Sequence, residues 1–148
     1  MPLNILITGA GISGLSSALS LRRAGHTVTI FERSRLTNEI GAAINIPPNA
    51  SRPLLAWGID PVKERFVAGT GIAIGIGATG KVVDETPLGW VGRVFGGEVY
   101  FAHRVDLHEA LRGLCVGEGR GERVRVELGR GVVGYVSLSI LEIKEMKG

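Results

Sequence analysis

The hydrophobic pattern changes period several times along the first part of the chain. Residues 3–7 form a largely apolar run rich in β-branched side chains, which is typical of a strand buried on both faces. Apolar positions then recur at helical spacing over residues 12–24, and Gly25 can end that helix in a left-handed conformation. A second strand-like run follows at residues 27–32. The pattern predicts a βαβ unit of about thirty residues and an α/β fold.

A glycine-rich loop joins the first predicted strand to the helix. Gly9, Gly11 and Gly14 have the spacing G-x-G-x-x-G. The first glycine permits a tight turn out of the strand, the second lets a pyrophosphate approach the backbone, and the third lets the helix pack closely on the sheet. Ile12 and Ser13 begin the helix, whose free N–H groups would face the phosphates. In this strand–loop–helix context the motif predicts a dinucleotide-binding site.

An acidic residue at the end of the second strand narrows the choice of dinucleotide. Glu32 follows Gly14 by eighteen residues, where a carboxylate can accept hydrogen bonds from ribose hydroxyls. Because a carboxylate repels a 2′-phosphate, FAD or NAD is expected rather than NADP. The neighbouring Arg33 is a weaker candidate for the same site and slightly reduces that preference. A βαβ unit whose site has decayed is the alternative.

Prolines mark the segment that follows the predicted βαβ unit. Pro47 and Pro48 favour an extended chain, after which Asn49 is expected to cap a short helix that Pro53 would shorten. Residues 66–101 predict strands and turns. Within them, isoleucines alternate with small residues, the chain turns at "ATGK", and it returns through two valines. This segment therefore predicts a β-hairpin.

A third helix is predicted near residue 106. Asp106 and Glu109 have the spacing of a capping box, with Asp106 as the N-cap and Arg104 just outside the helix. His103 and His108 are expected to be exposed. The apolar positions expected to face inward are Leu107, Ala110, Leu111 and Leu114.

The positive charges are spread along the chain, which has a formal net charge of +3. Arg22 and Arg23 fall in the last turn of the first predicted helix, where cations interact favourably with the helix dipole. Only residues 119–131 concentrate arginines. Apolar residues alternate within that tract, at Val124, Val126 and Leu128. The tract is therefore expected to be a half-buried strand with solvated arginines opposite, and no nucleic-acid partner is predicted.

Composition limits the remaining function classes. A chain of 148 residues with 45% apolar residues can bury one core, so one domain, or one domain and part of another, is expected. The single Cys115 is expected to be a buried thiol in a reducing compartment, and the three histidines have no metal-ligand spacing. Residues 3–21 lack a basic flank and are interrupted by polar side chains, so we expect no membrane span and a cytoplasmic location.

Three stretches in order resemble the class A flavoprotein monooxygenases, the FAD-dependent aromatic hydroxylases of the salicylate and p-hydroxybenzoate hydroxylase type. They are "GAGISGLSSALSLRRAGHTVTIFERS", "EIGAAINIPPNASRPLLAWGI" and "AHRVDLHEALR". The resemblance implies bound FAD, NAD(P)H as reductant, and an aromatic or similar small-molecule substrate. It also implies that Arg104 reaches the cofactor. Ala43 stands where that family usually has glycine, and is a weaker candidate contact.

The chain lacks motifs of that family's second half, since it contains no Asp-Gly or Gly-Asp dipeptide. We therefore interpret residues 1–148 as a partial, Rossmann-like FAD-binding domain in which 66–101 begin a β-rich substrate sheet. Catalytic residues are not identified, and turnover by this chain alone is not expected. Uncovered sheet edges predict self-association. The alternatives are a non-catalytic dinucleotide-binding module and a fragment of an NAD-dependent oxidoreductase.

Overall fold

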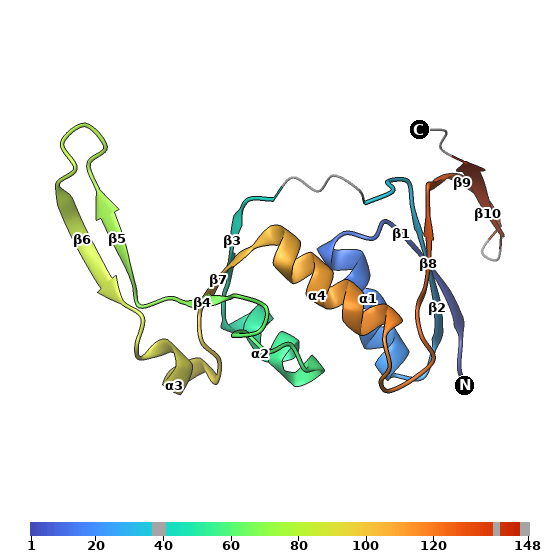
Figure 1. Ribbon diagram of the computed structural model, residues 1–148, viewed down its shortest axis with the longest axis horizontal. Coiled ribbons are helices and arrows are strands. Elements are labelled where there is room, and N and C mark those ends of the chain that lie inside the picture. Colours follow the sequence, from blue (N-terminus) through green and yellow to red (C-terminus); the bar gives the residue numbers. More distant parts are fainter. Residues whose placement is uncertain (37–40, 138–139, 146–148) are drawn as a thin grey trace. The chain divides into compact units, whose positions relative to one another are not determined.

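A computed structural model describes residues 1–36, 41–137 and 140–145 of the chain (Figure 1). The chain divides into two compact units. The first unit comprises Met1–Ile40 and Leu107–Gly148, and the second comprises Gly41–Asp106.

The first unit contains the predicted βαβ motif. Strand β1 (Asn4–Thr8), helix α1 (Ile12–Arg23) and strand β2 (Thr27–Glu32) follow one another, and β1 pairs in parallel with β2. On its other side β2 pairs in parallel with β8 (Arg125–Leu128), which gives the sheet order β1-β2-β8. The parallel sheet and the α/β fold class are therefore confirmed. Strands β9 (Arg130–Ser137) and β10 (Ile140–Glu145) form an antiparallel pair after the sheet.

Two helices cover one face of this sheet. Helix α1 lies beside the part of α4 (Arg104–Val116) that belongs to the first unit (Figure 1). The buried apolar side chains of the unit come from both helices, from β2 and from the start of β8: Leu15, Ala18, Leu19, Val28, Ile30, Leu107, Leu111, Cys115 and Val124. The predicted burial of Cys115 is confirmed. The predicted half-buried strand in the arginine-rich tract is also confirmed as β8.

The prediction that the first strand is buried on both faces was wrong. Exposed and partly buried residues alternate along β1, and the Leu6 side chain remains 44% exposed. The physical reason is that α1 packs on one face of the sheet only, so alternate residues of β1 point to the uncovered face. Strand β1 also lies at the edge of the sheet, where it has one neighbouring strand. A continuous apolar run therefore does not guarantee two covered faces.

Helix α1 ends as expected, and one charged side chain of its last turn is buried. Gly25 has a φ of 92°, the left-handed conformation that closes the helix. Arg22 lies in the last turn of the helix as predicted, but it is only 2% exposed, which the sequence did not indicate. Its guanidinium group donates hydrogen bonds to backbone carbonyls far along the chain, at Leu114, Cys115, Gly117 and Gly121. Arg22 is thus a part of the core of the first unit.

The second unit is built around a small antiparallel sheet of order β3-β7-β4. The elements that form this sheet are β3 (Ala43–Ile46), β4 (Val67–Ala68) and β7 (Tyr100–His103). Strands β5 (Gly71–Gly75) and β6 (Val82–Pro87) form the predicted hairpin, which is exposed on both faces. The short helix α3 (Val91–Phe95) within residues 66–101 was not expected.

Helix α2 (Pro48–Trp57) begins earlier than predicted. Pro47 is the N-cap and Pro48 is the first helical residue, so Asn49 lies inside the helix and does not cap it. Proline suits a first helical position because its fixed φ is already helical and its missing N–H would have no partner there. Pro53 does not shorten the helix, which continues to Trp57 and ends at Gly58 with a φ of 100°.

Helix α4 also begins earlier than predicted. It starts at Arg104, so Asp106 lies in its first turn and is not the N-cap. The Asp106 carboxylate instead pairs with the Arg65 guanidinium group. The reason is that β7 leads directly into the helix, with the Arg104 N–H donating to the Ala42 carbonyl at 2.9 Å.

The side of α4 that is buried differs in part from the predicted one. His108 was expected to be exposed but is only 3% exposed, whereas His103 is exposed as expected. Leu107 and Leu111 are buried as predicted, and Ala110 and Leu114 are only partly buried. The buried stripe therefore includes one polar side chain.

Candidate functional site

The three motif glycines in the first unit differ in backbone conformation and in the space around them. Gly9 has a φ of 92°, which strongly favours glycine, and its N–H donates to the Phe31 carbonyl at 2.8 Å. A Cβ on Gly14 would lie 2.0 Å from the Gly9 carbonyl oxygen, so only glycine allows α1 to pack this close to β1. A Cβ on Gly11 would meet nothing within 4 Å. The loop is therefore tight on its inner side and open at Gly11.

The start of α1 has the features of an anion-binding helix end. Gly11 is the N-cap residue, and its carbonyl accepts the first helical hydrogen bond, from the Leu15 N–H at 2.9 Å. No side chain caps this end and no acidic residue lies in its first turn. The amides of Ile12 and Ser13 and the partial positive charge of the helix are thus available to a phosphate.

Glu32 is anchored beside this loop by two backbone amides. Its Oε2 accepts a hydrogen bond from the Ala10 N–H at 2.7 Å, and its Oε1 accepts one from the Ser34 N–H at 2.7 Å. Each carboxylate oxygen can accept more than one hydrogen bond, so the group can still bind hydroxyls. The structure brings Glu32 to the glycine loop, as the motif spacing requires.

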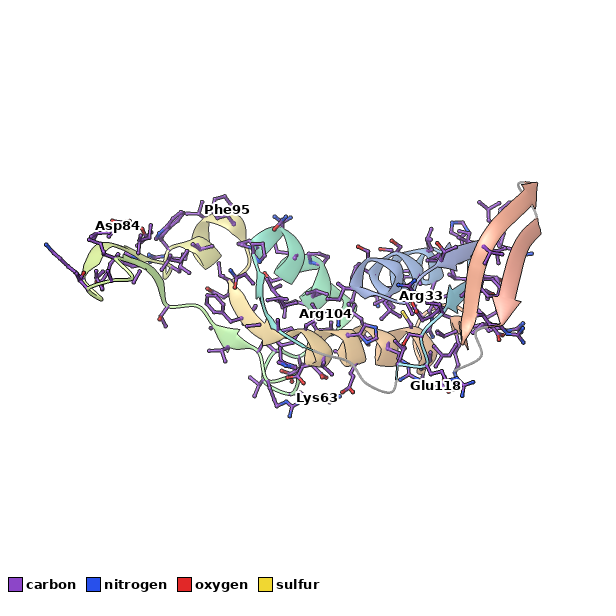
Figure 2. The ribbon with its side chains drawn as sticks, turned by 90° about the horizontal axis from the view of Figure 1, so that it is seen from above. Arg33, Lys63, Asp84, Phe95, Arg104 and Glu118 are labelled. Atoms are coloured by element: carbon purple, nitrogen blue, oxygen red, sulfur yellow. The ribbon has the colours of Figure 1, made fainter. Side chains whose placement is uncertain are left out.

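A cleft of about 250 Å³ opens at this end of the sheet. It is lined by the last residues of β1 and β2, by the residue after each, and by the start of β9: Thr8, Gly9, Phe31, Glu32, Arg33, Arg130, Gly131 and Val132. Arg33 lies at this end of the first unit in Figure 2. Glu32 and the motif glycine Gly9 therefore share one open site with the Arg33 candidate.

The sequence analysis missed the contribution of Arg130, Gly131 and Val132 to this cleft. Their segment was interpreted only as part of a half-buried strand. A usable signal was present, because β8 is parallel to β2 and residues after neighbouring parallel strands meet at one sheet edge. Gly129 has a φ of 68° and its N–H approaches the Ser34 carbonyl at 3.3 Å, which joins the two strand ends.

Two further candidates, Ala43 and Arg104, lie together in the second unit. Ala43 pairs with His103 across β3 and β7, and Arg104 directly follows that strand (Figure 2). At the nearby position 41 only glycine fits without a shift of its neighbour, since a Cβ there would lie 2.2 Å from the His103 ring. This corner of the second unit thus places the backbone of the Gly-Ala-Ala turn beside the start of α4.

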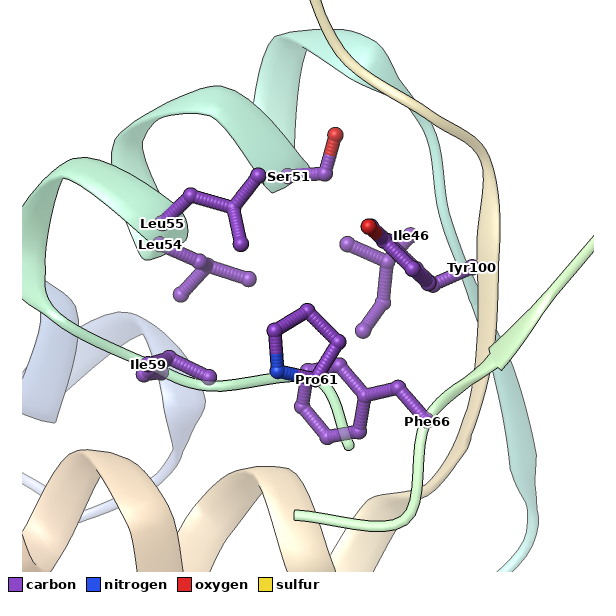
Figure 3. A pocket seen from close by; sticks show the side chains of 8 residues that line it. All are labelled: Ile46, Ser51, Leu54, Leu55, Ile59, Pro61, Phe66 and Tyr100. Carbon is purple, nitrogen blue, oxygen red and sulfur yellow. The ribbon is translucent and has the colours of Figure 1, made fainter. Parts of the chain in front are cut away.

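The second unit also contains a small apolar space, drawn in Figure 3. Its volume is about 0 Å³ on the measure that gives 250 Å³ for the cleft of the first unit, so it has no room for a small molecule. No charged side chain lines it, and the Ser51 hydroxyl already donates to the Glu98 carbonyl at 2.7 Å. This space is part of the packing around α2 and not a candidate site.

Neither a metal site nor a membrane span is found in the described part of the chain. Over residues 1–36, 41–137 and 140–145, no three His, Cys, Asp or Glu side chains are grouped so that they could hold a metal ion. Across the same residues, no helix is both long and apolar enough to cross a membrane.

Comparison with known proteins identifies homologues of this chain. Residues 7–43 match a family model described as an NAD(P)-binding Rossmann-like domain. The FAD-dependent monooxygenase cfoG of Aspergillus candidus is 45% identical over 139 residues, which are 93% of this chain and 32% of the relative. 3-Hydroxybenzoate 6-hydroxylase 1 of Aquipseudomonas alcaligenes is 40% identical over 118 residues, with 76% and 29% covered. The chain is homologous to FAD-dependent aromatic monooxygenases.

Solved structures of monooxygenases share the fold of this chain. The p-nitrophenol 4-monooxygenase of Pseudomonas putida DLL-E4 matches 98% of the chain with a TM-score of 0.82 at 16% identity, over 38% of its own chain. A 2-methyl-3-hydroxypyridine-5-carboxylic acid oxygenase matches 99% with a TM-score of 0.74 at 22% identity, also over 38%. The chain spans about a third of the length of the curated relatives it matches. The resemblance inferred from the sequence and the Rossmann-like fold are confirmed.

Proposed function

We propose that this chain forms the FAD-binding part of an NAD(P)H-dependent monooxygenase that hydroxylates an aromatic or similar small molecule. The observation that carries the proposal is the hydrogen bond from the Ala10 N–H to Glu32, which holds the carboxylate at the glycine loop that leads into the uncapped start of α1. Bound FAD would supply the redox and oxygen-transfer chemistry, as cofactors do in such enzymes. The residues of the chain would bind and orient it.

Each residue of the site has a separate binding role in this proposal. The amides of Gly11, Ile12 and Ser13 would hold the pyrophosphate, because they lie at an uncapped helix end beside an open space. Glu32 would accept hydrogen bonds from the ribose hydroxyls of the adenosine. Arg33 and Arg130 would border the adenosine in the cleft.

Ala43 and Arg104 would serve the same cofactor from the second unit. Arg104 would complement phosphate or flavin ring oxygens with its guanidinium group. The backbone at Ala43 would lie beside the flavin, and its methyl group would narrow the approach that glycine allows. Arg104 is assigned by the motif that it shares with the monooxygenases, whereas Ala43 is assigned by its position, where that family usually has glycine.

The substrate class is proposed from the relatives, and NAD(P)H as the reductant from the resemblance of the sequence to the class A flavoprotein monooxygenases. The names of the relatives describe hydroxylation of 3-hydroxybenzoate and oxygenation of p-nitrophenol. The chain spans about a third of the length of its curated relatives. We therefore propose complete turnover only for a longer polypeptide that contains this part. We expect this chain by itself to bind FAD without hydroxylating a substrate.

Flavin retention tests the proposal. The purified chain is incubated with FAD and desalted, and the visible absorbance is compared with that of Glu32→Gln and Arg104→Ala variants. Loss of a charge-assisted hydrogen bond changes affinity by about tenfold or more, so we expect weaker FAD retention in both variants. A Glu109→Ala variant, altered at an exposed position of α4, is the control and should retain FAD like the parent.

Competing ligands separate the remaining alternatives. Preference for NAD over FAD, with indifference to Arg104→Ala, would indicate an NAD-dependent oxidoreductase fragment. That outcome must be tested because the matching family model is described as NAD(P)-binding. Weak binding of ADP without retention of flavin would indicate a non-catalytic nucleotide-binding module.

A further inference from the structure

A buried histidine of α4 is hydrogen-bonded to the glycine loop. His108 lies on α4, is 3% exposed, and its Nε2 is 2.6 Å from the Ala10 carbonyl oxygen. A carbonyl oxygen only accepts hydrogen bonds, so Nε2 must carry the proton and donate. The two residues are 98 positions apart in the sequence. This hydrogen bond therefore fixes the loop to a helix that is not part of the βαβ motif.

Ala10 is held on both of its peptide groups. Its N–H, which belongs to the peptide shared with Gly9, donates to Glu32 at 2.7 Å. Its carbonyl, which belongs to the peptide shared with Gly11, accepts from His108. The Ala10 residue itself is 1% exposed. His108 and Glu32 thus fix the orientation of two consecutive peptide planes at the centre of the loop.

The geometry of the second peptide determines where the Gly11 amide points. In a trans peptide the carbonyl and the N–H lie on opposite sides of the bond, and no cis peptide is present in the described residues. Because the Ala10 carbonyl points towards buried His108, the Gly11 N–H must point away from it. Gly11 is also the residue beside which a Cβ would find no neighbour within 4 Å.

We propose that His108 is a positioning residue of the dinucleotide site, which orients the Gly11 amide towards the pyrophosphate and steadies Glu32 through Ala10. This inference rests on the proposed function. His108 is buried behind the loop and acts through Ala10. The benefit is preorganisation, because a loop whose donors already point at the ligand loses less conformational freedom on binding.

The test compares two substitutions of this histidine. His108→Leu removes the donor and leaves the Ala10 carbonyl buried without it, whereas His108→Gln places an amide donor near the position of Nε2. FAD and ADP affinities are measured for the parent, both variants, and a Glu109→Leu control on the same helix. We expect His108→Leu to bind both ligands at least tenfold more weakly, and His108→Gln and the control to stay within about threefold of the parent.

Amide hydrogen exchange in the absence of ligand provides a readout that a simple packing role would not change. We expect the Ala10 amide to exchange at least tenfold faster in His108→Leu than in the parent, and His108→Gln to restore slow exchange there. A double-mutant cycle of His108→Leu with Glu32→Gln should be non-additive for FAD affinity, since both act through Ala10. If His108→Leu does not fold, His108→Met, which also lacks a donor, replaces it in the affinity, exchange and cycle measurements, with the same expected results.

The outcomes distinguish this inference from the proposed function. If the parent binds FAD and His108→Leu binds it equally well, only the role of His108 is overturned. Weaker binding in His108→Leu with unchanged Ala10 exchange and no rescue by Gln would also overturn it, in favour of a packing role. If the parent binds neither FAD nor ADP, the proposed function fails and the role of His108 fails with it.

Discussion

Burial sets the chemical state of the single cysteine. The Cys115 side chain is fully buried, and its Sγ donates to the Leu15 carbonyl at 3.3 Å. Burial raises the pKa of the Cys115 thiol from 9.0 to about 11, while the nearby Arg22 charge acts in the opposite direction. The native state therefore holds the thiol proton more tightly than the unfolded chain does. This contribution to stability is complete below about pH 9 and is lost as the pH rises towards 11.

A Cys115→Ser variant tests this pH dependence. Serine keeps a hydroxyl donor for the Leu15 carbonyl and does not titrate in this range. We expect the free energy of unfolding of the parent to fall more steeply than that of the variant between about pH 9 and 11, with parallel behaviour from pH 6 to 8. Urea unfolding at a series of pH values measures it. Equal slopes for both proteins above pH 9 would contradict the expected effect of the buried thiol.

Sequence reasoning was correct for buried apolar residues and did not identify the buried polar ones. Cys115 was predicted to be buried because its neighbours are apolar, and it is. His108 was expected at the surface because polar side chains usually are exposed, and the burial of Arg22 was not predicted. Their burial depends on backbone carbonyls that lie more than ninety positions away, at Ala10 and around Leu114. Such acceptors belong to the folded backbone, and a side-chain pattern does not reveal them.

At the scale of elements, one arginine connects the end of α1 with the end of α4 and with the loop before β8. Arg22 at the end of α1 donates to Leu114 and Cys115 in the last turn of α4, and to Gly117 and Gly121 in the loop before β8. The carbonyls in the last turn of a helix have no partner within that helix, and a positive charge there is also favoured by the helix dipole. The guanidinium group supplies donors in a fixed planar arrangement that lysine cannot reproduce.

Removal of this guanidinium group should destabilise the first unit. We expect Arg22→Met to lower the free energy of unfolding by about 2 kcal/mol or more, because several carbonyls lose a charged donor at once. Arg22→Lys should recover only part of the loss. Arg112→Met, at an exposed position of α4, is the control and should change stability by about 0.5 kcal/mol or less. Chemical unfolding of the four proteins measures the difference, and similar values for Arg22→Met and the control would contradict it.

The elements that the sequence predicted well have strong local signals. The βαβ unit is set by apolar periodicity and by glycines at turns, and its strands and helix agree with the prediction to within about two residues. The starts of α2 and α4 were wrong for a different reason. Asn49 and Asp106 match capping patterns, but a proline begins α2 and the pairing of β7 with β3 leads directly into α4. Strand pairing across the second unit is not a local property.

At the scale of the whole molecule, the described chain leaves much apolar surface open. The side chains of the β5–β6 hairpin are exposed on both faces, and the large apolar ones are Ile72, Ile74, Ile76, Val82 and Val83. A second open surface is the edge strand β1. Contiguous apolar surface and unpaired strand edges both favour association between molecules. The expectation of self-association from the sequence therefore has two specific surfaces to test, and the hairpin carries the larger apolar side chains.

Substitution on the hairpin should reduce self-association and leave cofactor binding intact. Threonine preserves β-branching, so an Ile72→Thr, Ile74→Thr, Val83→Thr variant should keep the hairpin and lose apolar surface. We expect the parent to sediment with a concentration-dependent, larger average mass, and the variant to shift towards the monomer with unchanged FAD retention. Val62→Thr, at an isolated side chain that is 86% exposed, is the matched control and should behave like the parent. A parent that is monomeric at all concentrations would contradict the prediction, and a variant that associates like the parent would assign association to the β1 edge.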